Sequence, residues 1–209
     1  AANPGDFLTT ADLALYTARP TRAGRLRATG RVREQEGSFA VGDLLVEEVE
    51  TGAVVAVGTS GYAVKAGAGM MGMVQEFELP LHRWDEVADG LAPYDALTGA
   101  EVAESDAEHA VVRMPVGLHH INGGRVVHGG VMASLAYIAA DAVLRAAKAP
   151  ANNPVSLKFD LLRSATEGEL IANGRLLRSG RTLSTVAVDL VDDRGNLVGH
   201  GTVTSTVPS

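Results

Sequence analysis

The stretch that decides the fold is INGGRVVHGGVMASLAYIAADAVLRAAK, residues 121–148. Its first part, Asn122–Gly130, is a glycine-rich turn. From Val131 to Lys148 the chain is rich in alanine and contains neither proline nor glycine, which favours a helix. The apolar residues of this segment recur every three or four positions, at Met132, Leu135, Ala136, Ala139 and Val143. Such a stripe indicates a helix that buries one side in a core.

Residues on both sides of this helix predict antiparallel strands. Val155, Leu157, Phe159 and Leu161 alternate with polar residues, as expected for a strand with one buried side. The other predicted strands cover residues 111–116 before the helix and residues 169–177, 185–191 and 197–207 after it. Glycine-containing turns separate the strands that follow the helix. The predicted order is therefore a strand, a buried helix, and a strand meander that can wrap around the helix.

The N-terminal part of the chain contains a second copy of this meander, in residues 12–64. Residues of the C-terminal meander repeat those found 144 positions earlier, as in Arg19 and Arg163, Gly24 and Gly168, Leu26 and Leu170, Ala28 and Ala172, Gly30 and Gly174, and Arg31 and Arg175. After one residue of slippage, Gly52, Val55, Gly58 and Thr59 match Gly195, Val198, Gly201 and Thr202. The matches fall on turns as well as on strands, so we interpret the two segments as an internal repeat.

The repeat divides the chain into three predicted parts. We expect an incomplete first copy at residues 1–65, a linker at 66–91 and a complete second copy at 92–209. Only eleven residues precede Asp12, too few for a helix as long as that of the second copy. A meander without a helix exposes its apolar side, so we expect upstream sequence, the segment 66–90 or another subunit to cover it. The methionine-rich start of the linker favours packing, and Trp84 is predicted to begin a short helix.

The composition excludes several classes of protein. The 209 residues carry a formal charge of −7, which argues against nucleic-acid binding, and the arginines of residues 19–33 are interpreted as exposed strand residues. The absence of cysteine excludes disulfides, zinc–thiolate sites and iron–sulfur clusters. We see neither a membrane-spanning run nor a signal peptide, so we expect a cytoplasmic protein. The heavy use of alanine, glycine and arginine is typical of a GC-rich bacterial genome.

The Asn122–Gly130 turn, the helix and the meander together resemble the hotdog-fold acyl-CoA thioesterases, and most closely the phenylacetate-pathway and 4-hydroxybenzoyl-CoA branch. That branch carries Asn-x-x-Gly-x-x-His-Gly-Gly before its central helix; here Asn122 and His128-Gly129-Gly130 match, and the intermediate glycine is displaced to 123 and 124. The resemblance covers residues 92–207, with residues 12–64 as an incomplete second copy. It implies an α+β fold, an antiparallel sheet wrapped around a central helix in two tandem copies. It also implies a homo-oligomer or pseudo-dimer without metal or cofactor.

The resemblance assigns roles to five residues of the second copy. A helix start offers unpaired N–H groups to the oxyanion of thioester hydrolysis, and the family implies the N–H of Gly129 as the donor. Gly129 and Gly130 let the acyl carbonyl approach the backbone without a Cβ in the way. Asn122 resembles the residue that holds the thioester or the attacking water, and His128 the residue that shapes the turn. Ser156 matches a serine that assists the water in some members, although a solvent-facing strand residue is the simpler interpretation.

One position departs from the family pattern. Members usually carry Asp or Glu on the helix nine residues after the motif histidine, as general base or nucleophile, and Tyr137 stands there in this sequence. Tyrosine is a poor base at neutral pH. Asp141 follows one turn later and is either a displaced catalytic acid, a member of a second pocket, or the partner of Arg145 in a surface ion pair. Tyr137 is a candidate for substrate binding or for core packing.

The leading hypothesis is an acyl-CoA thioesterase-like protein that hydrolyses an acyl thioester at the start of the helix. The water would be activated by Asp141 or by a carboxylate from the helix missing in the first copy. Candidate partners of the CoA phosphates are Arg163, Arg178 and Arg181. The alternative is an acyl-CoA-binding or regulatory protein that has lost its base, and a hotdog dehydratase is a weaker third. The sequence contains neither a Gly-x-Ser-x-Gly elbow nor a phosphate loop, so serine hydrolase and nucleotidase functions have no support.

Overall fold

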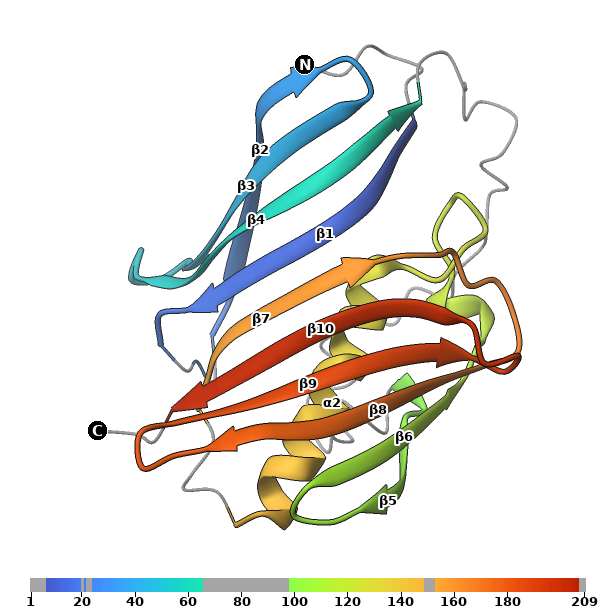
Figure 1. The fold of residues 1–209 in the computed structure, drawn as a ribbon. Coiled ribbons are helices and arrows are strands. Elements are labelled where there is room, and N and C mark those ends of the chain that lie inside the picture. Colours follow the sequence, from blue (N-terminus) through green and yellow to red (C-terminus); the bar gives the residue numbers. More distant parts are fainter. Residues whose placement is uncertain (1–6, 20, 22–23, 66–97, 149–152, 207–209) are drawn as a thin grey trace.

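A computed structural model describes residues 7–19, 21, 24–65, 98–148 and 153–206 of the chain (Figure 1). Its elements, in chain order, are β1 (Phe7–Thr17), β2 (Leu26–Glu36), β3 (Phe39–Glu48), β4 (Val54–Lys65), β5 (Glu101–Ser105), β6 (His109–Pro115), a 3-10 turn (Leu118–His120), α2 (Gly129–Ala146), β7 (Asn153–Leu161), β8 (Glu169–Ser179), β9 (Leu183–Asp192) and β10 (Leu197–Thr206). The strands and the helix predicted from the sequence are confirmed to within a few residues. Strand β5 was not predicted.

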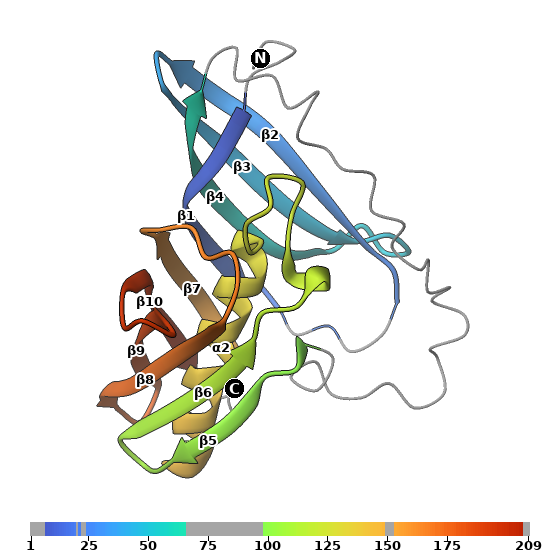
Figure 2. The same cartoon turned by 90° about the vertical axis from the view of Figure 1, so that its right-hand side faces the viewer.

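All ten strands form one antiparallel sheet in the order β2-β3-β4-β1-β7-β10-β9-β8-β6-β5. Helix α2 lies on one side of the C-terminal half and packs mainly on β8, β9 and β6 (Figure 2). Among the described residues the fold is thus α+β, with one central helix against a ten-stranded sheet. The predicted α+β class, with an antiparallel sheet packed against a central helix, is confirmed.

The hydrophobic core lies between α2 and the strands of the C-terminal half. The largest fully buried side chains include Phe159, Met132, Leu135, Leu170 and Leu190. Length and mean hydropathy alone would allow α2 to cross a membrane. Its buried residues, however, pack against strands of the same chain, so α2 is the core helix of this fold.

The two meanders meet through β1 and β7, which pair in an antiparallel register centred on Ala14 and Lys158. Lys158 lies 144 positions after Ala14, the offset of the sequence repeat. The register pairs Leu13 with Phe159 and Leu15 with Leu157, and the repeat exchanges these two pairs. The seam therefore has the pseudo-twofold symmetry of an isologous interface. The predicted pairing of the two meanders into one continuous sheet is confirmed.

Strand pairing within the two meanders also agrees residue by residue. Gly58 lies opposite Leu15 in the first meander, and Gly201 lies opposite Phe159 in the second. A Cβ at Gly58 would come within 2.5 Å of the Ala14 carbonyl oxygen, and one at Gly201 within 2.5 Å of the Lys158 carbonyl oxygen. The matched glycines of the repeat therefore permit the same close strand contact in both copies.

The two halves differ in what covers them. The C-terminal half has α2, whereas the described residues contain no second long helix on the N-terminal half. A tandem of two complete hotdog domains is therefore not shown, and the division at residues 65 and 91 stays a prediction. The expected short helix at Trp84 and the methionine-rich segment lie outside the described residues.

Candidate functional site

The site is built on the turn that leads into α2. The side-chain oxygen of Asn122 accepts hydrogen bonds from the N–H groups of Gly124 at 2.9 Å and Val126 at 3.4 Å. Arg125 adopts a φ of 60°, and Ile121 forms an isolated bridge with Val127 that closes the turn. Because its oxygen is held by the turn, Asn122 leaves its amide N–H₂ group as the end that can reach a ligand.

The start of α2 has one N–H group that the helix and its cap do not use. The His128 ring caps the helix, and its Nδ1 accepts the N–H of Gly130 at 3.0 Å. The N–H groups of Val131 and Met132 both donate to the His128 carbonyl. The N–H of Gly129 has no acceptor among the described residues. It is available to an anion or a polarised carbonyl, and the helix dipole favours negative charge there.

A cleft of about 250 Å³ opens beside this N–H group. Its walls come from β1, from the turn and first residues of α2, and from the end of β7, and they comprise Leu8, Thr9, Thr10, Asn122, Val126, Val127, Gly129, Met132, Leu161, Leu162, Arg163 and Ser164. This surface is called the first cleft below. It brings together Asn122, Gly129 and Arg163 of the predicted site residues.

The Leu161 side chain lies over Gly129 and limits the space around it. A Cβ at Gly129 would come within 2.8 Å of Leu161 Cδ2. The absence of a side chain at Gly129 therefore makes room for Leu161, and not directly for a ligand as we expected from the sequence. At Gly130 a Cβ would meet the His128 ring at 3.1 Å, so this glycine accommodates the capping histidine.

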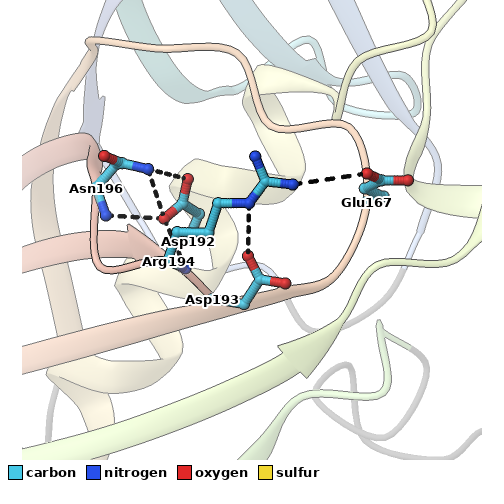
Figure 3. A network of polar contacts seen from close by, with 5 residues as sticks. All are labelled: Glu167, Asp192, Asp193, Arg194 and Asn196. Carbon is cyan, nitrogen blue, oxygen red and sulfur yellow. Dashed lines mark hydrogen bonds and ion pairs between the residues drawn. The ribbon is translucent and has the colours of Figure 1, made fainter.

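Residues 162–168 form a loop that supplies Arg163 and Ser164 to the first cleft. Hydrogen bonds hold this loop on several sides. The Ala165 carbonyl accepts the Val127 N–H, and the N–H of Arg163 donates to the Val198 carbonyl. Figure 3 shows the neighbouring β9–β10 hairpin, in which Asp192 accepts hydrogen bonds from Arg194 and Asn196. Arg194 lies 4.0 Å from Glu167 of the loop, an exposed contact that contributes little energy. The backbone bonds thus position the loop.

A second, smaller cleft of about 180 Å³ lies at the other end of the β1–β7 seam. Leu15, Thr17, Ser134, Tyr137, Pro154, Ser156 and Leu157 line it. It takes up two predicted site residues, Tyr137 and Ser156. Under the repeat, Thr10 and Leu161 of the first cleft correspond to Pro154 and Thr17 of the second. The two clefts therefore occupy pseudo-twofold-related places on the seam.

Tyr137 is a neutral hydroxyl group in the second cleft. Burial raises the pKa of Tyr137, and the nearby Asp141 carboxylate raises it further. At neutral pH this side chain is a hydrogen-bond donor and cannot act as a base. Tyr137 stands eight residues after Gly129, about 12 Å along the helix axis, which separates it from the first cleft.

Asp141 lines neither cleft and forms an ion pair with Arg145, with Oδ2 and Nε 2.6 Å apart. Its side chain is 18% exposed. Twelve residues separate Asp141 from Gly129, which is about 18 Å along one helix. An oxyanion donor and a base must both lie near the same reacting atom. The structure therefore does not bring Asp141 of this chain to the first cleft.

Two other predicted groups lie away from the first cleft. Arg178 and Arg181 lie at the β8–β9 hairpin. Across the sheet, Ser179 of this hairpin pairs with Ser184, Ser184 pairs with Ser205 of β10, and Ser205 pairs with Pro154 of β7. This is the end of β7 opposite Leu161, so only Arg163 of the three predicted phosphate partners reaches the first cleft. The described residues contain no cluster of three metal-ligating side chains.

His120 is a buried residue of the 3-10 turn that precedes Asn122. Its Nδ1 accepts the Gly117 N–H at 3.0 Å, and its Nε2 lies 3.0 Å from the Thr98 carbonyl. The ring is therefore a neutral imidazole that donates through Nε2. Burial lowers the pKa of His120, and the adjacent His119 lowers it further. The His120 carbonyl accepts the His128 N–H, which ties this turn to the helix cap.

Sequence reasoning missed the wall that β1 and the end of β7 supply. Thr9, Thr10, Leu161 and Ser164 line the first cleft but belong to no motif. The register of the repeat is the signal that could have found them, because it places the start of β1 opposite the end of β7.

Comparison with protein families matches residues 119–206 to a model described as the acyl-CoA thioesterase N-terminal domain. Comparison with curated protein sequences gives no significant match. The matched segment contains the helix, its cap and the meander β7–β10, and so covers the first cleft except for the wall from β1.

Solved structures agree with this assignment for the C-terminal half. The chain is similar to AziG of S. sahachiroi, with 25% identity, a TM-score of 0.53 and coverage of 57% of this chain and 100% of the other. It also resembles the E. coli PaaI protein from the phenylacetic acid degradation operon (21%, TM-score 0.52, 55% and 83%). A hypothetical thioesterase from Streptococcus pneumoniae, solved with coenzyme A, matches at 22%, TM-score 0.50, over 53% and 86%. The C-terminal half thus has the hotdog fold of these structures, and its residues 119–206 are similar to the acyl-CoA thioesterase N-terminal domain.

Proposed function

We propose that the chain binds an acyl thioester of coenzyme A in the first cleft and hydrolyses it there. The observation that carries the proposal is the N–H of Gly129, which lines the cleft at the positive end of α2 and has no acceptor among the described residues. A thioester carbonyl placed on this N–H would be polarised, and its oxyanion would be stabilised as water adds. The coenzyme A in the pneumococcal structure supports the choice of ligand.

In the proposed reaction, water attacks the carbonyl carbon and the C–S bond breaks. The oxygen of the water joins the acyl group as a carboxylic acid, and the thiol leaves with a proton. The amide N–H₂ group of Asn122 is the polar side-chain group that we assign to the thioester or the water. We assign Arg163, which lines the cleft, to a phosphate of the coenzyme.

The base is the part of the reaction for which the described residues supply no carboxylate at the first cleft. No Asp or Glu is among its lining residues, and Asp141 lies about 18 Å away along α2. We assign Asp141 and Tyr137 instead to the side of α2 that faces the second cleft. A carboxylate for the first cleft would have to come from a helix on the N-terminal half.

The test is release of free thiol from a panel of acyl-CoAs by the purified chain, with Gly129→Pro as the critical variant. Proline suits the first position of a helix, and His128 already has the extended backbone (φ −61°, ψ 131°) that precedes proline. The substitution removes the N–H of interest and puts the proline Cδ in the place of its hydrogen. Gly129→Ala is the matched control because it also adds a Cβ toward Leu161 but keeps the N–H.

The second candidate function is acyl-CoA binding without hydrolysis. The specific observation in its favour is that no carboxylate is among the described residues that line either cleft, with the neutral Tyr137 at the position where the family carries its acid. Tight binding of a non-hydrolysable acyl-CoA with no thiol release from any substrate would establish this function. Tyr137→Asp is the companion variant: because it alters the second cleft, it should not by itself create hydrolysis at Gly129.

A further inference from the structure

The lining of the first cleft changes in character from its opening to its floor. Exposed residues form the opening, among them Arg163 and Leu162. The floor is formed by Val127 and Met132, whose exposed fractions are only 3% and 1%. Arg163 is the one charged side chain among the described lining residues, and it lies at the opening. A ligand with one charged end and one apolar end would therefore enter with its apolar end first.

Met132 closes the floor on the side of α2. It follows Gly129 by three residues, so the two residues lie on the same side of the helix, about 4.5 Å apart along its axis. Long side chains of a helix point back toward its N-terminus, which directs the Met132 side chain toward Gly129. Met132 and Val127 both belong to the hydrophobic core, which lies behind them. A chain that enters past Gly129 therefore ends against Met132.

The volume of the first cleft limits the size of the acyl group. A cavity of about 150 Å³ holds a molecule of six carbon atoms such as benzene, so the cleft of about 250 Å³ has room for about ten heavy atoms. The thioester group and the methylene beside its sulfur take about four of these places, which leaves room for about six further carbon atoms. With the carbonyl carbon included, an acyl group of about seven carbons fills the cleft.

We propose that the acyl group of the substrate is a short, uncharged alkyl chain of at most about seven carbons, and that Met132 sets this limit. The inference rests on the proposed binding of an acyl thioester in the first cleft. The carbonyl lies at the N–H of Gly129, the alkyl chain extends to Met132, and the coenzyme extends through the opening past Arg163. An acyl group that ends in a carboxylate should be rejected, because the described residues of the floor offer no cation to a buried charge.

Two series of ligands test the length limit on the full 209-residue chain. Straight-chain acyl-CoAs from acetyl to dodecanoyl report thiol release. The corresponding 2-oxoalkyl-CoA thioethers, which keep a carbonyl group and cannot be hydrolysed, report binding by calorimetry. Affinity should rise about four-fold with each buried methylene and stop rising at about seven carbons. Thiol release should be slower by about ten-fold or more from decanoyl-CoA than from hexanoyl-CoA, and from succinyl-CoA than from butanoyl-CoA.

Truncation of Met132 should lengthen the chain that the cleft accepts. Met132→Ala removes Cγ, Sδ and Cε from the floor, so the limit should rise by about three carbons. Leu135→Ala is the matched control, because Leu135 is also 1% exposed on α2 but does not line the cleft, and the limit should stay where it is. Circular dichroism shows whether each variant remains folded. If Met132→Ala does not fold, Met132→Val decides the outcome with a smaller shift in the same direction.

The outcomes separate this inference from the proposed hydrolysis. Equal binding and turnover of the decanoyl and hexanoyl derivatives would overturn the length limit and leave hydrolysis standing. A folded Met132 variant that keeps the wild-type limit, or a Leu135→Ala variant that shifts it as well, would also overturn the inference. If the thioethers show the limit and its shift but no acyl-CoA releases thiol, the inference is supported and hydrolysis alone fails. If no thioether of any length binds, both proposals are overturned.

Discussion

The two meanders of this chain have the same strand order and register but different energetics. The C-terminal meander, β7–β10, closes on α2 and buries Leu170, Val188 and Leu190 completely. The N-terminal meander, β1–β4, has equivalent residues at the same places in the sheet, and Leu26 remains half exposed. Apolar alternation therefore tells which side of a strand can be buried, whereas the covering element decides how much free energy that side contributes. The predictions below test this difference, from the largest expected effect to the smallest.

Leucine truncation should separate the two meanders most strongly. Leu170→Ala should lower the free energy of unfolding by about 2–5 kcal/mol, because it leaves a cavity under α2. Leu26→Ala removes the same atoms from a half-exposed position and should cost less than about 1 kcal/mol. Urea denaturation of both variants measures the difference. Equal losses would show that the N-terminal meander is as well packed as the C-terminal one.

The variants Gly129→Pro and Gly129→Ala test the candidate site at the start of α2. Relative to Gly129→Ala, Gly129→Pro should raise the barrier to thioester hydrolysis by about 2.7–4 kcal/mol, which is about 10²–10³-fold in turnover. The reason is the loss of one N–H donor, while both variants carry the same Cβ toward Leu161. Steady-state thiol release measures it. Equal turnover of the two variants would remove Gly129 as the oxyanion donor.

The two matched glycines should respond differently to the same substitution. Gly174→Ala places a methyl group 3.0 Å from the backbone of α2 and should destabilise the chain by about 1–3 kcal/mol. Gly30→Ala meets only Leu44 at 3.8 Å and should change stability by less than about 0.5 kcal/mol. Thermal or urea unfolding of the two variants provides the measurement. A large loss for Gly30→Ala would mean that a backbone already lies close to Gly30 on this side of β2.

Asp141→Asn should have a small effect on both stability and turnover. The Asp141–Arg145 pair spans one turn of a helix, and Arg145 is largely exposed, so its loss should cost under about 1 kcal/mol. Thiol release should stay unchanged, because Asp141 lies about 18 Å from Gly129 along the helix. A drop of about 10²–10⁴-fold would restore Asp141 as the general base that the sequence suggested.

Acid should weaken the C-terminal half through His120. The folded-state pKa of His120 is lowered, so its contribution to stability is complete above the unfolded pKa of about 6.5. As the pH falls below that value toward the folded pKa, the unfolded chain binds more protons and stability declines. His120→Gln should flatten this dependence in urea titrations between about pH 5 and 6.5. An unchanged pH profile in the variant would assign the acid sensitivity to another group.

The sequence predicted the candidate site in part. The turn at Asn122 and His128 and the start of α2 at Gly129 are local features, because capping and glycine placement act within a few residues. The assignment of Ser156 and Tyr137 to the same site was not supported, since they line the second cleft with Leu15 and Thr17. Which residues face one cleft depends on contacts between distant strands. The cytoplasmic location and the homo-oligomer stay predictions.

The sequence alone determined the strand meander, the core helix, and the repeat whose 144-residue offset equals the separation of Ala14 and Lys158 on the seam. Periodicity and turn residues encode such features, because they depend on the local backbone and on which side of each element is apolar. Only the tertiary structure showed that α2 packs on the strands of the C-terminal half and that Asp141 is far from Gly129. It also placed Leu161 against Gly129. The physical reason is that burial and catalytic distance are set by packing between elements, and identical strand patterns leave that packing undetermined.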